Sequence, residues 1–246
     1  MIFGRRKRQE AEAVVEDVAV EDTDVATADD AGAGDATSEA DEAMEKAEAQ
    51  WLAWDEAFDR EEGPFDIAEV DLDADDVQRL DLGPLIVTPF EGMSLQLQVN
   101  KQQVPQALLV QDGKSGIEVA VFGAPSRSAY IPEVRREMIA ATRSVQGMRM
   151  TIRKGPFGTE ILRAVPVQDA NGNVGMQITR TWFAEGPSWV VRGVVFGKAA
   201  LEPDDEDATI AIEEFFANLV VRRGDAPVAP GAVIPFKLPE QPQAQG

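Results

Sequence analysis

The stretch ALLVQDGKSGIEVAVF, residues 107–122, decides the fold of this chain. It consists of two apolar runs separated by the turn-forming residues 112–116, DGKSG. A short glycine-containing loop between two apolar runs predicts a β-hairpin, because glycine adopts the positive φ angles that tight turns require. Just upstream, apolar and polar residues alternate over 93–99, MSLQLQV, which predicts a half-buried strand. The hairpin and this strand together predict an antiparallel sheet.

The sequence after the hairpin predicts two helices and further strands. Pro132 can open a helix at its first turn, the apolar residues that follow share one helical face, and Gly147 ends it. A second helix is predicted over 204–218, because its first turn is acidic, which the helix dipole favours, and its apolar residues fall on one side. Strands are predicted at 148–153, 157–167, 174–184, 189–197 and 219–221. Asn171-Gly172 predicts a tight turn between two of these strands.

This order of elements predicts an α+β fold, with a mostly antiparallel β-sheet packed by two main helices and a disordered acidic N-terminal arm. The arm is expected over residues 1–62, because its small and acidic residues cannot bury enough apolar surface to fold. It contains a short amphipathic helix at about 42–60. We expect the α+β domain over 63–224. Residues 225–246 are expected to form an extended tail, because proline recurs there.

Charge is distributed unevenly along the chain. The net charge is −21, from 23 basic and 44 acidic residues. Residues 9–62 hold 20 acidic and 2 basic side chains, whereas residues 83–246 hold 17 acidic and 16 basic ones. The domain is therefore almost neutral, and its net charge gives no general attraction to nucleic acid, although a local basic patch stays possible.

The chain contains no cysteine and no histidine. It therefore lacks disulfides, the commonest metal ligand and the commonest general base near neutral pH. Asp71, Asp73 and Asp75 resemble the start of a calcium loop, but Asp76 and Leu82 stand where glycine and glutamate are needed. We therefore expect no metal, no cofactor and no catalytic residue. No apolar run approaches the ~20 residues of a membrane span, and the start lacks a secretory signal, so we expect a cytoplasmic protein.

Trp51, Trp54 and Phe58 are candidate partner-binding residues. Their spacing places the three rings on one side of the arm helix. The acidic side chains expected mostly outside this stripe are those of Glu48, Asp55, Glu56 and Asp59. Two alternatives stay open: the rings pack back on the domain, or they form a docking helix for the groove of a partner protein.

Other side chains carry weaker hypotheses. A basic cluster that could contact an anionic surface, with a frayed terminus as the alternative, comprises Arg5, Arg6, Lys7 and Arg8. Glu118 and Glu160 lie within predicted strands and are expected to face outward. If the protein were an enzyme, Glu160 with Arg163 or Arg180 would be candidates for its site. The sequence GPFG at 155–158 predicts a turn, with a ligand-contacting loop as the alternative.

Several short stretches resemble a known family. They are GPFD at 63–66, RLDLG at 79–83, GPFGTE at 155–160, VRG at 191–193 and RRGD at 222–225, with the basic start GRRKR at 4–8. On these stretches the chain is similar to an actinobacterial family of proteins of unknown function, DUF3710, over about 63–240. The resemblance implies a cytoplasmic actinobacterial protein and no particular activity, and it hints at nucleotide or DNA metabolism because members lie near a dUTPase gene. The order of elements is also similar to the Mog1/PsbP-type sandwich, which implies only binding uses.

These observations predict a non-catalytic binding or scaffold module with an unknown protein partner. One alternative is a ligand-binding protein or enzyme of nucleotide metabolism, which a concave cluster of carboxylates and arginines would favour. The other is a nucleic-acid-associated protein, which salt-dependent DNA binding by the domain without its arm would favour.

Overall fold

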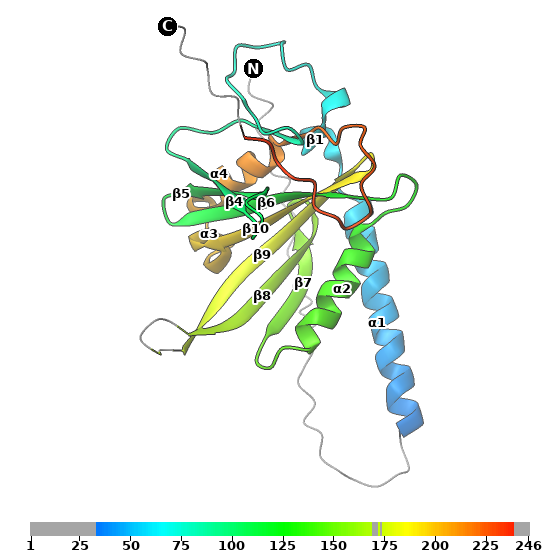
Figure 1. Ribbon diagram of the computed structural model, residues 1–246. Helices are drawn as coiled ribbons and strands as arrows, with labels where there is room; N and C mark the ends of the chain where they lie inside the picture. Colours follow the sequence, from blue (N-terminus) through cyan, green and yellow to red (C-terminus); the bar gives the residue numbers. More distant parts are fainter. Residues whose placement is uncertain (1–32, 169–171, 173, 239–246) are drawn as a thin grey trace, which may run out of the picture.

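The computed structural model describes residues 33–168, 172 and 174–238, and Figure 1 shows the fold that they form. Residues 1–32, which include the basic cluster Arg5 to Arg8 and most of the predicted disordered arm, lie outside the described part. The fold is α+β, as predicted, with a large antiparallel sheet and helices packed on it. The helices are α1 Ala33–Glu56, α2 Ile131–Arg143, α3 Lys198–Leu201 and α4 Glu206–Ala217, with the 3-10 helices η1 Arg60–Glu62 and η2 Ile67–Glu69. Within these described ranges, no helix is long and apolar enough to cross a membrane.

Seven antiparallel strands form the main sheet, in the order β4-β5-β6-β10-β9-β8-β7. They are β4 Ser94–Val99, β5 Pro105–Asp112, β6 Ser115–Gly123, β7 Arg149–Gly155, β8 Gly158–Gln168, β9 Val174–Gly186 and β10 Trp189–Gly197. The predicted hairpin is confirmed, because β5 and β6 pair as far as Asp112↔Ser115 across a turn at Gly113, whose φ is +56°. β6 also pairs with β10, so the hairpin connects β4, on one side, with β10, β9, β8 and β7 on the other.

The loop between β8 and β9 contains the predicted Asn171-Gly172 turn. The last strand pair before this loop is Gln168↔Val174. Gly172 has φ +85°, which agrees with the positive φ predicted for it. Asn171 lies outside the described residues, so the prediction for it stays a prediction.

A smaller, four-stranded sheet joins the two ends of the domain. Its order is β1-β11-β3-β2, with β1 Phe65–Asp66, β2 Leu80–Asp81, β3 Leu85–Val87 and β11 Val220–Val221. β1 and β11 are parallel, so the first strand of the domain pairs with the last one. The sequence predicts β11 but not β1 or β2, each of which is two residues long and shows no period.

The main sheet buries different elements on its two faces, because successive residues of a strand point to opposite sides. On one face, Trp182 and Val191 pack with Phe216 of α4 and with the small sheet. On the other face, Phe183 and Val190 pack under α2. Figure 1 shows α2 beside β7 to β9, with α1 running alongside α2. The α2 face is therefore covered at its β7–β9 end by helices.

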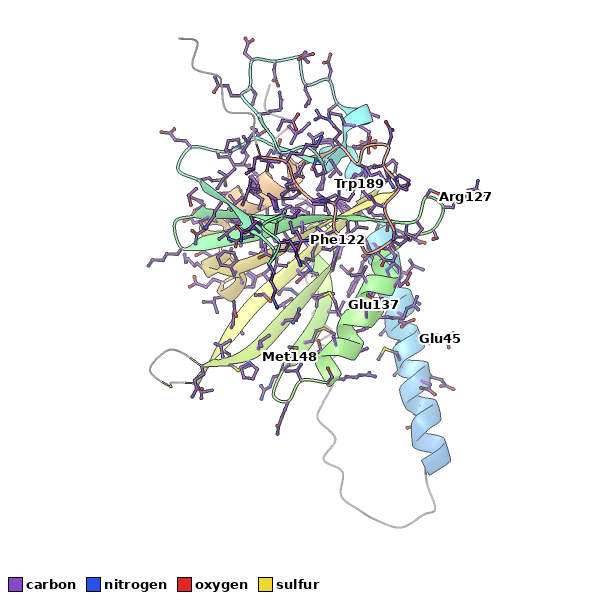
Figure 2. The ribbon with its side chains drawn as sticks, viewed as in Figure 1. Glu45, Phe122, Arg127, Glu137, Met148 and Trp189 are labelled. Atoms are coloured by element: carbon purple, nitrogen blue, oxygen red, sulfur yellow. The ribbon has the colours of Figure 1, made fainter. Side chains whose placement is uncertain are left out.

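α1 extends further toward the N-terminus than the predicted helix at 42–60, and it ends earlier. It begins at Ala33, so residues 33–40, which the sequence predicts to be disordered, form its first turns. Three of these eight residues are alanine, the best helix former, and the segment continues directly into the Glu- and Ala-rich stretch 41–50, so the helix can extend through it. The first half of α1 projects from the domain, and Figure 2 shows Glu45 directed away from it.

The described part of the C-terminal tail, residues 225–238, packs on the domain. Ile234 and Phe236 are buried. The backbone N–H of Ile234 donates to the carbonyl of Val121 at 2.8 Å, and that of Phe236 donates to the carbonyl of Pro105 at 2.9 Å. The tail therefore contributes to the core through Ile234 and Phe236, while residues 239–246 lie outside the described part.

Candidate functional site

One carboxylate holds the C-terminal end of α1 on the domain. Asp55 Oδ1 accepts hydrogen bonds from the backbone N–H of Thr159 at 2.9 Å and from its Oγ1 at 2.6 Å. Asp55 Oδ2 pairs with Nη1 of Arg135 at 2.8 Å, and Arg135 is only 3% exposed. Asp55 thus joins α1 to both α2 and β8. It lies in the packed interface instead of outside it, where the sequence predicts it.

The aromatic side chains at the end of α1 pack on the chain's own domain to different degrees. Trp51 is 8% exposed, and the guanidinium of Arg135 lies 5.4 Å from its ring centroid. Phe58, just after α1, is half-buried and meets Phe157 edge-on, with ring centroids 5.8 Å apart. Trp54 is half-buried and borders a pocket. The structure therefore places Trp51 and Phe58 on the domain, whereas Trp54 keeps a surface that a partner could reach.

This pocket, here named the junction pocket, lies where the end of α1, η1 and the turn between β7 and β8 meet. Its volume is about 330 Å³. Trp54, Phe58 and Pro156 supply its apolar lining. Its charged lining comes from the carboxylates of Asp59, Glu61 and Glu62 and from the ammonium group of Lys154. The pocket therefore brings together two segments that the sequence singles out separately, the aromatic arm helix and the GPFG turn.

The GPFG sequence forms the predicted turn, with Gly155 paired to Gly158. Phe157 points into the core and is buried. Gly158 has φ +88°, and a Cβ atom there would lie 3.0 Å from Oδ1 of Asp55, so glycine is needed both for the backbone and for the close approach of α1. Because the turn also lines the junction pocket, a ligand-contacting role for it stays a prediction.

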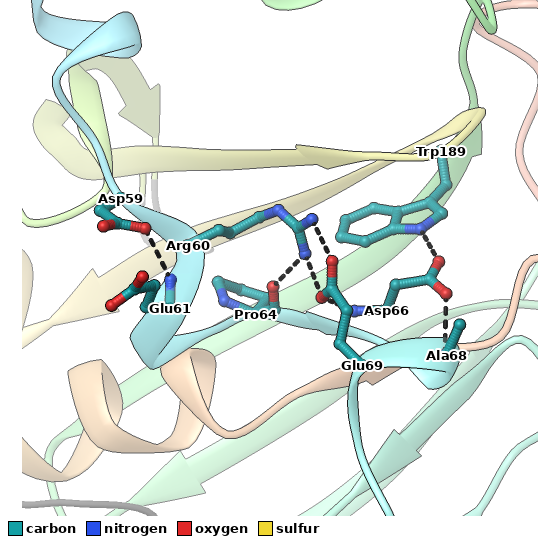
Figure 3. A network of polar contacts seen from close by, with 8 residues as sticks. All are labelled: Asp59, Arg60, Glu61, Pro64, Asp66, Ala68, Glu69 and Trp189. Carbon is teal, nitrogen blue, oxygen red and sulfur yellow. Dashed lines mark hydrogen bonds and ion pairs between the residues drawn. The ribbon is translucent and has the colours of Figure 1, made fainter.

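η1 is fixed by the polar network in Figure 3. Asp59 Oδ1 accepts a hydrogen bond from the backbone N–H of Glu61 at 3.0 Å. Arg60 is directed to the other side, where its two Nη atoms bind the carboxylate of Glu69 at 2.7 and 2.6 Å, and Nη1 also donates to the carbonyl of Pro64 at 3.1 Å. The hydrogen bond from Arg60 lowers the pKa of Glu69 below its ordinary value.

The same network reaches the core through Trp189. The guanidinium of Arg60 lies 5.4 Å from the ring centroid of Trp189, and Nε1 of Trp189 donates to Oδ2 of Asp66 at 2.7 Å. Asp66 also caps η2 in a capping box with Glu69. Arg60 is thus engaged by Glu69 and Trp189, on the side of η1 away from Asp59 and Glu61.

The junction pocket consequently carries excess negative charge. Three carboxylates and one ammonium group line it. The C-terminus of α1 adds the negative end of the helix dipole, and its last turn, all of it within the described residues, bears no basic side chain. Figure 3 shows Asp59 and Glu61 on one side of η1 with Arg60 leading away from them.

A second polar cluster lies inside the core. Glu160 is fully buried, so the prediction that it faces outward is wrong. Its carboxylate pairs with Arg180 at 2.7 Å and with Arg153 at 2.8 Å, and it accepts a hydrogen bond from Nε1 of Trp182. Arg163, the other candidate partner of Glu160, lies on the opposite face of the sheet because it is three residues further along β8. This enclosed and well-paired cluster is suited to holding the fold.

In the acidic segment that resembles a calcium loop, the carboxylates of Asp71 and Asp75 accept hydrogen bonds from the protein itself. The carboxylate of Asp75 accepts two hydrogen bonds from Arg79, at 2.8 and 3.0 Å. Asp71 Oδ1 accepts the backbone N–H of Asp73 at 3.1 Å. In the part of the chain that the structure describes, no group of three or more acidic side chains is arranged to hold a metal ion.

The fold and the site define a class of protein. It is an α+β domain with an acidic, aromatic pocket beside a docked N-terminal helix. The model of the family DUF3710, described as a protein of unknown function, matches residues 63–245, and the chain belongs to this family. No curated protein matches the chain. The matched region begins at Gly63, so it contains the β7–β8 side of the junction pocket, while the α1 and η1 side precedes it.

Proposed function

We propose that this protein is a non-catalytic binding module whose junction pocket receives a basic side chain of a partner protein. The observation that supports this most directly is the meeting of aromatic and carboxylate groups in one pocket of about 330 Å³. The compartment in the proposal is the cytoplasm of an actinobacterium, as the sequence resemblance implies.

The chemistry of the pocket favours a cation that also carries apolar atoms. An arginine or lysine head over the face of Trp54 gains cation–π attraction, and carboxylates such as Glu61 accept its hydrogen bonds. Its aliphatic stem would pack against Phe58 and Pro156, as the stems of long basic side chains do on apolar surfaces. Lys154 provides discrimination, because it repels a segment that is basic at every position.

The walls of the pocket are held before any partner arrives. Asp55 anchors the end of α1 to Thr159 and Arg135, and Arg60 anchors η1 to Glu69. A site built on anchored elements loses less conformational entropy when it binds. Preorganisation therefore favours a recognition role for this junction.

The test is a peptide array with degenerate flanks and a central arginine, lysine, citrulline or glutamate, probed with the full chain. We expect retention of the arginine and lysine peptides and loss of the neutral isostere citrulline and of glutamate. Trp54→Ala should weaken the retained peptides by about tenfold, the value of a well-placed cation–π contact with its packing. Leu52→Ala is the matched control, because Leu52 is exposed on the same helix and does not line the pocket.

Equal binding of citrulline and arginine peptides would contradict the proposal, as would equal losses in the Trp54 and Leu52 variants. Added salt gives a second criterion, because an ion-paired contact at the surface weakens as ionic strength rises. The alternative, a ligand-binding protein, is supported by a different part of the fold, the end of the main sheet that is formed by β4, β5, β6 and β10.

A further inference from the structure

The α2 face of the main sheet is hollowed at its other end, over β4, β5, β6 and β10. A pocket of about 320 Å³ lies there, named here the alanine-floored pocket. Ala107 and Ala120 are buried at its base, and taller side chains, among them Phe122 and Arg192, stand around them. Val233 of the C-terminal tail closes one side. Phe122 lies on β6, an inner strand of the main sheet, and is labelled in Figure 2.

Arg192 lies on the wall of this pocket with its charge incompletely paired. Its Nη2 is 3.7 Å from Oε1 of Glu118, too far for a good hydrogen bond. Its Nε is buried and has no hydrogen-bond partner among the described residues, and its guanidinium lies 5.0 Å from the ring centroid of Phe122. Burial lowers the pKa of Arg192, Glu118 opposes this effect, and the positive charge of Arg163 adds to it.

This arrangement leaves a hydrogen-bond donor of Arg192 unsatisfied within the described residues. A buried N–H donor without an acceptor loses the hydrogen bond that water would give it, and Glu118 at 3.7 Å compensates the charge of Arg192 only in part. A fold that keeps such a group on the wall of a pocket gains a preformed site for an anion. The guanidinium fork suits a planar oxyanion, which can accept two parallel hydrogen bonds from it.

We propose that the alanine-floored pocket binds a small organic carboxylate through Arg192. The carboxylate lies against the guanidinium, the apolar body of the ligand covers Ala107 and Ala120, and the amide groups of Gln98 and Gln106 bond to its other polar atoms. Glu118 favours a monoanion over a phosphate dianion, because its own negative charge repels the second charge. The volume is at the lower end of the range for small-molecule sites, which limits the ligand to a small body. This site does not depend on the junction pocket.

The test is an NMR titration of the ¹⁵N-labelled full chain that follows the Nε–H signal of Arg192 and the side-chain amides of Gln98 and Gln106. The probes are acetate, L-lactate, benzoate and indole-3-acetate, with benzamide as the neutral match of benzoate and inorganic phosphate as the competing oxyanion. We expect at least one carboxylate to shift all three signals saturably, and benzamide to leave them unchanged. Arg192→Lys should weaken that carboxylate by about tenfold, because lysine cannot form the paired hydrogen bonds.

Two further variants complete the test. Glu118→Gln should strengthen carboxylate binding severalfold, because it removes the competing negative charge. Arg149→Lys is the control for loss of an arginine, since Arg149 is exposed on β7 at the far edge of the sheet, and it should bind as the unchanged protein does. The proposal is overturned if no carboxylate gives a saturable shift, if benzamide matches benzoate, if phosphate binds more tightly, or if Arg192→Lys retains full affinity.

Discussion

Two pairs of glutamate and arginine on the same sheet differ in almost every respect. Glu160 and Arg180 face the core side, where Glu160 is fully buried and its carboxylate has three donors, two of them from ion pairs at 2.7 and 2.8 Å. Glu118 and Arg192 face the other side, 3.7 Å apart, with side chains that are 41% and 33% exposed. The carboxylate of the first pair has all of its partners within the fold, whereas the guanidinium of the second pair keeps N–H groups that have no close acceptor among the described residues.

The difference shows how surroundings decide the role of a charged pair. A carboxylate taken out of water is tolerated only where hydrogen bonds replace those of water, as around Glu160. A pair at the surface of a pocket is partly solvated, so it can remain unsaturated and exchange a weak internal contact for a ligand. The same two residue types therefore stabilise the fold in one place and form a candidate binding site in the other.

The largest expected effect comes from breaking the complete pair. Glu160→Gln leaves Arg180 and Arg153 without their counter-charge, and Arg180 is buried, so we expect a loss of about 3–5 kcal/mol in the free energy of unfolding. Glu118→Gln is the matched substitution in the loose pair and should cost less than ~1 kcal/mol. Urea denaturation followed by far-UV circular dichroism measures both values. Similar losses for the two variants would remove the distinction between the pairs.

Asp55 offers an intermediate case, because it pairs with a buried arginine but is itself partly exposed. Asp55→Asn removes the charge that faces Arg135 and weakens the bonds to Thr159, so we expect a loss of about 2–3 kcal/mol in the docking of α1. The measurement is the rate of proteolytic cleavage within α1, with thermal unfolding of the domain in parallel. Glu56→Gln is the control, because Glu56 is exposed in the same turn. Cleavage at the same rate in both variants would show that Asp55 is no anchor.

Much of the fold could be predicted from the sequence, because its signals are local. The turn at Gly113 and the apolar runs beside it carry the hairpin, and the order of the later strands and of two helices follows from period and turn residues. The two-residue strands β1 and β2 could not be predicted, because they are formed by pairing with distant partners and have no pattern of their own. The start of α1 at Ala33 was missed because its acidic composition also favours disorder.

The candidate sites could be predicted only in part. Trp54 and the GPFG turn were singled out, but their meeting depends on how α1 docks, and that depends on Asp55 and Arg135. Arg135 had one available signal, since it is four residues after the buried Ile131 and three before Met138, on the apolar side of α2. Arg192 had a weak signal, since it is the one charged residue of the predicted strand 189–197, but only the positions of Glu118 and Phe122 on the neighbouring strand show that its charge is incompletely paired.

A third glutamate–arginine pair, Glu69 with Arg60, sharpens the comparison and should give the smallest effect. Its two hydrogen bonds are short, at 2.7 and 2.6 Å, but the side chain of Glu69 is 40% exposed, so water screens the pair. We expect Glu69→Gln to cost about 0.5 kcal/mol near neutral pH, far less than Glu160→Gln, although both glutamates have close arginine partners. Burial, and not distance alone, would then set the energy of such a pair.

The pKa of Glu69 determines how the stabilisation by this pair changes with pH. The hydrogen bond from Arg60 lowers the pKa of Glu69 in the folded protein, so the ionised form is favoured there and the unfolded chain binds the proton more readily. The contribution of Glu69 is therefore complete above the pKa of an unfolded glutamate, and it is lost as the pH falls through the lower folded pKa. Urea denaturation of the unchanged protein and of Glu69→Gln over this acid range measures the difference, with Glu91→Gln as the exposed control. A difference that grows as the pH falls would contradict the assigned sign, and one as large as that of Glu160→Gln would show that exposure does not separate these pairs.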